Sequence, residues 1–286
     1  MEHLMLNAYT DNLTIKRVIE SNQPFFIGRI AGIELQTAYN LVERNTVELS
    51  YNKIELENNA GIRVENHDSL TVYTTKLIQS YEHCTHIAEW DQKGDVFAIT
   101  GNGQSMIAER TFSIPKLNAL SLEPYYFEES WMTALKGKRI LIIHPFVTTI
   151  QKQVGNLSAL FPNRSWFEDC TFQLVKPPLT LAGNHQNKFW EEHCEECIQS
   201  IKQCDTFDIA LVAAGGYGML LCDFIFKELG KSVLYIGGAL QLFFGIIGKR
   251  WFTNKDILNL LNEDWIRPDK KDVPDNFKKV ENGCYW

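Results

Sequence analysis

The stretch FDIALVAAGGYGMLLCDFIFKELGKSVLYIGG, Phe207 to Gly238, decides the fold. It contains two short apolar runs, each followed by a glycine turn, and between them an apolar segment that ends at Gly230. A buried strand, a helix and a second buried strand of this combined length make a βαβ unit, whose two strands are parallel. The stretch therefore predicts a doubly wound, Rossmann-like parallel sheet in the C-terminal half of the chain.

Further strands are predicted on both sides of this unit. KRILIIHPF (138–146) and TFQLVK (171–176) are β-rich runs, with helical segments near 149–160 and 190–203. In the first half, PFFIGRI (24–30) predicts a buried strand that leads through a turn into a helix, IELQTAYNLVE. DVFAIT (95–100) predicts another strand, which ends at Gly101 and Gly103. We expect an N-terminal α/β half over 1–135 and a Rossmann-like half over 136–286, with a cleft shared between them.

Composition excludes several classes of protein. The net charge of −7, with scattered Lys and Arg, is not the electrostatic footprint of a nucleic-acid binder. Seven irregularly spaced cysteines indicate reduced thiols and a cytoplasmic setting, in the cytoplasm of a host cell if the chain is viral. The N-terminus does not resemble a signal peptide, and no apolar stretch is long enough to span a bilayer. Whether the chain forms a homo-oligomer stays open.

The two glycine turns are candidate ligand sites. Gly215, Gly216, Tyr217 and Gly218 lie where a strand passes into a helix, and backbone N–H groups at such a place favour an anion. Tight packing alone explains these glycines about equally well. No acidic residue stands near Tyr235, where a dinucleotide-binding domain would hold its ribose, so NAD is disfavoured.

The second glycine turn leads into a stretch with cationic and aromatic residues. Parallel strands bring both turns to the same edge of the sheet, and the segment after the second one holds side chains suited to phosphate oxygens and to a base or sugar face. An exposed Lys-Arg pair beside a core tryptophan is the plainer alternative. The candidates are Gly237, Gly238, Gln241, Lys249, Arg250 and Trp251.

Candidate catalytic residues lie at the predicted strand ends. Arg29 and Glu34 flank a strand-to-helix turn, where Glu34 is suited to act as a general base, or merely favours the helix N-terminus and pairs with Arg29. His144 ends a strand and is taken as a third candidate, although a hydrogen-bonded structural histidine is the commoner case. A loop with Glu123, Tyr125 and Tyr126 is assigned to the sugar or acceptor side.

Several motifs together carry a resemblance over about residues 24–286. GRIAGIEL, LEPYYFEESWMTALKGKRILIIHPFVTTIQKQ, FDIALVAAGGYGMLL, GKSVLYIGGALQLFFGIIGKRW, NEDWIRP and VENGCYW resemble a group of bacterial and viral proteins linked to surface-polysaccharide synthesis. More distantly, the layout is similar to GT-D type glycosyltransferases, whose N-terminal turn bears Asp-x-Glu. Glu34 matches the glutamate of that motif, and Gly32 stands at the aspartate position.

The resemblance implies transfer of a sugar from a nucleotide-diphosphate donor to a glycan acceptor, with a UDP-sugar as the first candidate donor. It makes 136–286 the nucleotide-sugar-binding half. Because the Asp-x-Glu motif is incomplete, no metal ligand is assigned, Mn²⁺ or Mg²⁺ stays open as a cofactor, and Lys249, Arg250 or His144 is expected to neutralise the leaving diphosphate. Two alternatives stay open: a nucleotide- or sugar-binding protein without activity, and another Rossmann enzyme such as a methyltransferase.

Overall fold

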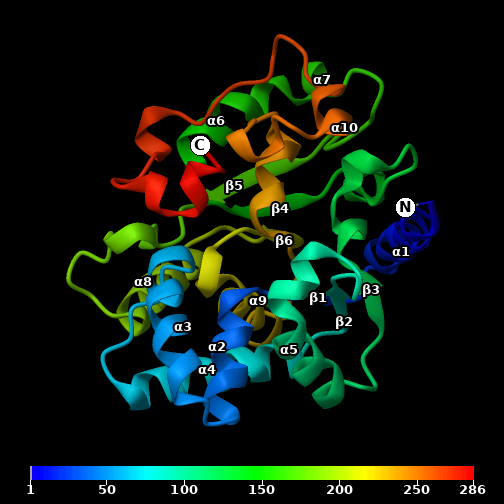
Figure 1. Cartoon of the computed structure of the whole chain (residues 1–286). Helices are drawn as coiled ribbons and strands as arrows, with labels where there is room; N and C mark the ends of the chain where they lie inside the picture. Colours follow the sequence, from blue (N-terminus) through cyan, green and yellow to red (C-terminus); the bar gives the residue numbers. More distant parts are fainter. Residues whose placement is uncertain (1) are drawn as a thin grey trace.

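One parallel sheet runs through the middle of the molecule (Figure 1). The structure is a computed structural model that describes residues 2–286, and the side chains of all of these except 2–6, 95 and 99. The seven strands of this region follow the order β3-β2-β1-β7-β6-β4-β5. They are β1 (Phe26–Arg29), β2 (His86–Glu89), β3 (Lys116–Asn118), β4 (Arg139–Ile143), β5 (Thr171–Val175), β6 (Ile209–Val212) and β7 (Ser232–Tyr235).

The predicted α/β fold with a Rossmann-like parallel sheet is confirmed. The βαβ unit read from the sequence is β6, α9 (Gly218–Lys227) and β7, as predicted. β1 belongs to the predicted N-terminal half and β7 to the predicted C-terminal half, yet the two strands pair, with Ile27 opposite Leu234. Strands from both predicted halves therefore form one sheet, and the division into two halves stays a prediction.

Helices cover both faces of the sheet. Figure 1 shows α2–α5, α8 and α9 together on one side, and α6, α7 and α10 with the C-terminal tail on the other. Alternate strand residues point to opposite faces, so that Ile140 and Ile142 belong to one core cluster and Leu141 and Ile143 to the other. The helices are α1 (Glu2–Glu20), α2 (Ile33–Val42), α3 (Thr46–Asn59), α4 (His67–Glu82), α5 (Asp95–Arg110), α6 (Val147–Gln153), α7 (Leu157–Leu160), α8 (Trp190–Lys202), α9 (Gly218–Lys227) and α10 (Lys255–Leu258).

The strand predicted over residues 95–100 is wrong, since these residues begin α5. The glycines that were read as its end lie inside the helix and allow close packing. A Cβ on Gly103 would come within 2.7 Å of the Cβ of Leu35 on α2, so the two helices touch there. The strand that pairs with β1 in this part of the chain is β2, which was not predicted.

The segments that follow the neighbouring strands β1 and β7 run to opposite faces of the sheet. After β1 the chain enters α2, whose Leu35 and Ala38 belong to the core on one face. After β7 it enters the 3₁₀ segment η7 (Gly237–Phe244), whose Leu240 and Phe243 belong to the core on the other face. Open α/β sheets bind ligands at the carboxyl edge, at a place where neighbouring connections diverge in this way.

Candidate functional site

Arg29 ends β1 at the carboxyl edge of the sheet. Its guanidinium carbon lies 5.3 Å from the centre of the Trp90 ring, and its Nη2 lies beside Gly237. Neither neighbour accepts a hydrogen bond from it, and the buried Nε–H of Arg29 has no partner among the described residues. A guanidinium whose donors lack protein acceptors is suited to an anionic ligand, which it can bind through two oxygens at once.

Glu34 lies in the first turn of α2 and is 7% exposed. Burial raises the pKa of its carboxyl above the ordinary value, although backbone N–H groups and the charge of Arg29 oppose this shift. Glu34 and Arg29 do not form an ion pair, so the salt link considered from the sequence is not present. A carboxyl group with a raised pKa is a stronger base when ionised than an ordinary surface carboxylate.

Glu123 approaches the same region from the loop between β3 and β4. Burial raises the pKa of its carboxyl, while a hydrogen bond from Tyr125 and the charges of Arg29 and Arg250 lower it. Burial also raises the pKa of Tyr126 to about 12, and the phenol oxygen accepts a hydrogen bond of 2.9 Å from Asn254. The structure thus brings Glu34 and Glu123 within the electrostatic reach of one arginine.

Arg250 is held by the C-terminal tail. Its Nη1 donates to the Tyr285 hydroxyl over 2.9 Å, and its Nη2 forms an ion pair of 3.1 Å with Glu281. The backbone N–H of Arg250 donates to Cys284 over 2.7 Å, and the Tyr285 ring lies under the guanidinium. The GKRW and ENGCYW motifs therefore contact each other at the edge of the site.

The other candidate residues in the segment after the second glycine turn differ in their exposure to solvent. Lys249 is exposed, whereas Trp251 is buried against the core and does not offer a free ring face. Gln241 is buried and donates to Ile246 over 3.0 Å, so it holds the fold. Gly238 lies against the Tyr285 ring, where a Cβ would approach to 2.4 Å.

Two backbone N–H groups of the first glycine turn are already hydrogen-bonded within the protein. The N–H of Gly216 donates to Ala60 over 2.9 Å, and that of Tyr217 donates to Ala214 over 3.1 Å. A Cβ on Gly218 would come within 2.2 Å of the Tyr235 ring. These contacts correspond to the packing alternative, and the exposed Gly215 is the member of the turn left accessible. Two of the N–H groups expected to bind a phosphate are therefore already used.

Glu34 nevertheless lies near this turn. The hydroxyls of Tyr73 and Tyr235 donate to Gly216 and Gly215 over 2.9 and 3.0 Å, and the charge of Glu34 contributes to raising the pKa of both phenols. Burial is the larger cause of both shifts. The carboxylate from the first half and the glycine turn from the second thus share one polar region.

His144 is a structural histidine. It is 2% exposed, and its Nδ1 accepts a hydrogen bond of 2.9 Å from the N–H of Phe146. Burial lowers the pKa of the imidazole to about 3, so the ring is neutral near pH 7. The prediction that His144 neutralises a leaving diphosphate is corrected by this geometry, because a neutral ring carries no charge to do so.

Trp90 and Gln104 border the site and were not predicted. The signal in the sequence is HIAEW (86–90), a short run with an acidic residue and a tryptophan at its end. Tyr285 and Glu281 were also missed, because they lie 35 and 31 residues from Arg250 along the sequence and no local pattern shows their contact with it.

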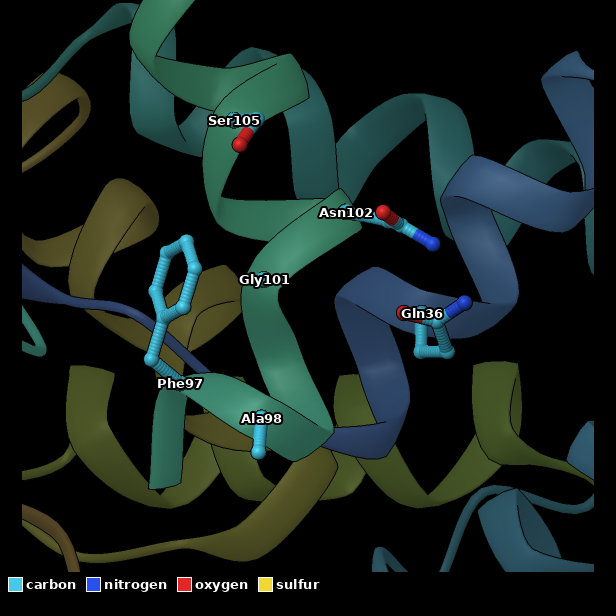
Figure 2. Close-up of a pocket in the computed structure, with 6 residues that line it drawn as sticks. All are labelled: Gln36, Phe97, Ala98, Gly101, Asn102 and Ser105. Carbon is cyan, nitrogen blue, oxygen red and sulfur yellow. The ribbon is translucent and has the colours of Figure 1, made fainter. Parts of the chain in front are cut away.

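A separate surface pocket of about 370 Å³ lies between α2 and α5 (Figure 2). It holds no predicted site residue; its lining is Gln36, Phe97, Ala98, Gly101, Asn102 and Ser105. Within the described part of the chain no His, Cys, Asp or Glu side chains gather in groups of three around a metal position. Over the same residues, no helix combines the length and apolar character needed to cross a membrane.

Comparison with known proteins found no matching family model, no matching curated protein and no matching solved structure.

Proposed function

We propose that this protein is a glycosyltransferase that moves a sugar from a nucleotide-diphosphate donor to a glycan acceptor. The observation that carries the proposal is the Arg29 guanidinium, whose buried Nε–H has no acceptor among the described residues and whose charge acts on the buried Glu34 and the half-buried Glu123. In the proposed reaction a diphosphate supplies the oxygens that this N–H lacks, and a carboxylate accepts the proton of the acceptor hydroxyl.

Each residue has a distinct part in this reaction. Arg29 binds the diphosphate and stabilises the negative charge that grows on it as the sugar leaves. Gly237, with a φ of +70° and no side chain, leaves the space that the Arg29 guanidinium occupies. Arg250 adds a second positive charge that acts on Glu123.

Glu34 is the proposed base. An unassisted sugar hydroxyl is a poor nucleophile near neutral pH, so a carboxylate must accept its proton as the new glycosidic bond forms. Burial raises the pKa of Glu34, and a backbone hydrogen bond and the charge of Arg29 oppose that rise. Glu123, which accepts the Tyr125 hydrogen bond, orients the sugar or acceptor.

The test is turnover of a panel of UDP-, GDP- and dTDP-sugars, measured as release of the nucleoside diphosphate with and without Mn²⁺ and with glycan acceptors. We expect release from one class of donor, and an Arg29→Gln variant that loses at least about tenfold in kcat/KM. Arg110→Gln removes an exposed arginine far along α5 and serves as the matched control. Donor binding without release in the wild-type protein would favour the binding-protein alternative.

A further inference from the structure

The residue that holds Arg29 in its binding orientation is Trp90, at the carboxyl end of β2. The guanidinium lies over the indole ring at 5.3 Å, a separation at which a cation and an aromatic face attract each other. This contact uses no N–H group of the arginine. It therefore restrains the guanidinium and leaves its donors available for a ligand.

Trp90 is itself held by three hydrogen bonds, one of its indole ring and two of its backbone. Its Nε1–H donates to Ile30 over 3.1 Å, which ties β2 to the residue after Arg29. The backbone N–H of Trp90 donates to the Gln104 side chain over 3.0 Å, and the amide of Gln104 donates back to the Trp90 carbonyl over 2.9 Å. Gln104 lies inside α5 and is 3% exposed. Such a reciprocal pair leaves the backbone of Trp90 little freedom to move.

Two further contacts, one at Gly237 and one at Tyr81, restrain Arg29. Nη2 of Arg29 occupies the space over Gly237, and the backbone of Arg29 is bound through its carbonyl to the Tyr81 hydroxyl at 2.8 Å. The arginine is therefore confined between the ends of β2 and β7 by groups that do not accept its hydrogen bonds. The buried Nε–H has no acceptor within the part of the chain described.

We propose that Trp90, clamped by Gln104, is a positioning residue that presents the Arg29 guanidinium to a diphosphate. The inference rests on the proposed function for the identity of the whole donor, but concerns only the anion-binding step. A guanidinium held in advance by an aromatic face loses little further freedom on binding, so the affinity for a diphosphate depends on the ring. Trp90 acts through Arg29 and needs no contact with the ligand.

The experiment is a double-mutant cycle on the full chain, with inorganic pyrophosphate and UDP as titrants in calorimetry. We expect Trp90→Leu to weaken binding about 2- to 30-fold and Trp90→Phe, which keeps an aromatic face, to weaken it less. In an Arg29→Gln background, Trp90→Leu is expected to cause no further loss, because the ring then has no cation to hold. Phe189→Leu, which removes a half-buried ring under Arg63, is the matched control and leaves affinity unchanged.

The outcomes separate this inference from the proposed function. Unchanged affinity in Trp90→Leu, or equal losses with and without Arg29, would show that Trp90 only fills space. A wild-type protein that binds neither titrant would overturn the inference as well. A wild-type protein that binds pyrophosphate with the predicted coupling, yet turns over no nucleotide-sugar, would uphold Trp90 and end the transferase proposal. If Trp90→Leu does not fold, Trp90→Met carries the same cycle, because it also lacks an aromatic face.

Discussion

Nη2 of Arg29 lies where a side chain at Gly237 would have to be, since a Cβ there would approach it to 2.0 Å. β1 and β7 are neighbours in the sheet, so this contact joins the strand that ends in Arg29 to the glycine turn after β7. The site therefore depends on two strand ends that lie far apart in the sequence.

Replacement of this glycine tests that dependence. Gly237→Ala is expected to displace the guanidinium and to weaken pyrophosphate binding about tenfold or more, besides a cost of about 1 kcal/mol for the left-handed backbone. Gly230→Ala is the control, because Gly230 has a similar φ of +62° and no atom within 4 Å of the place that a Cβ would take. Equal affinity in the two variants, measured by calorimetry, would contradict the placement of Arg29.

The buried carboxyl of Glu34 should reduce stability at neutral pH. Its pKa in the folded protein lies above the ordinary 4.5, so between these two values the folded chain binds more protons than the unfolded chain. The free energy of unfolding therefore falls as the pH rises through this window. Glu34→Gln is expected to remove that fall and to be more stable than the wild type at pH 7. Urea unfolding at pH 4.5 and 7 measures it, with the exposed Glu109→Gln as the control that retains the fall.

Burial of His144 should make the folded protein less stable as the pH falls, whereas burial of Glu34 makes it less stable as the pH rises. Its pKa of about 3 when folded lies below the ordinary 6.5, so the unfolded chain binds more protons between these values and stability falls as the pH falls. His144→Leu should make this dependence shallower, while at pH 7 it costs about 1–3 kcal/mol because the Phe146 N–H loses its acceptor. His144→Asn supplies another acceptor and should lose less. A loss of turnover in a stably folded His144→Asn protein would return His144 to the catalytic residues.

The C-terminal tail is fastened by Asp272, which is fully buried. Its carboxylate accepts from the N–H and hydroxyl of Thr149 at 2.7 and 2.6 Å, at the start of α6. Asp272→Asn is expected to cost about 1.5–3 kcal/mol in unfolding free energy, since hydrogen bonds to a charged group are lost. Asp275→Asn, at an exposed position nearby, should stay within about 0.5 kcal/mol of the wild type. Equal denaturation midpoints for the two would show that the tail is not held through Asp272.

Helices and strands could be predicted where the spacing of apolar residues and the positions of the glycine turns indicated the same element. β1, α2, β4 and the β6-α9-β7 unit fall within the predicted segments. The strand prediction for residues 95–100 failed, because a short run of apolar and β-branched residues is compatible with either a strand or a buried helix, and these residues begin α5. The pairing of β1 with β7 is a contact between distant segments, which no local pattern contains.

The charged residues of the candidate site could be proposed from the sequence, but the residues that hold them in position could not. Arg29, Glu34 and Glu123 were proposed from their positions at strand ends and in a loop, and the charge of Arg29 acts on both carboxyl groups. The use of the Gly216 and Tyr217 N–H groups by the protein could not be read from the glycines, since the same residues serve packing and phosphate binding. Trp90, Gln104 and Tyr285 depend on contacts between different elements and were missed for that reason.

The most direct test of the account compares turnover and donor affinity in Glu34→Gln, using the nucleotide-sugar that the wild type hydrolyses or transfers. The base assignment predicts that kcat falls about 100-fold or more, as expected when a general base is lost, while the donor Kd stays within about twofold. Unchanged turnover with unchanged affinity would contradict the assignment of Glu34, and with it the claim that this edge of the sheet is a catalytic site.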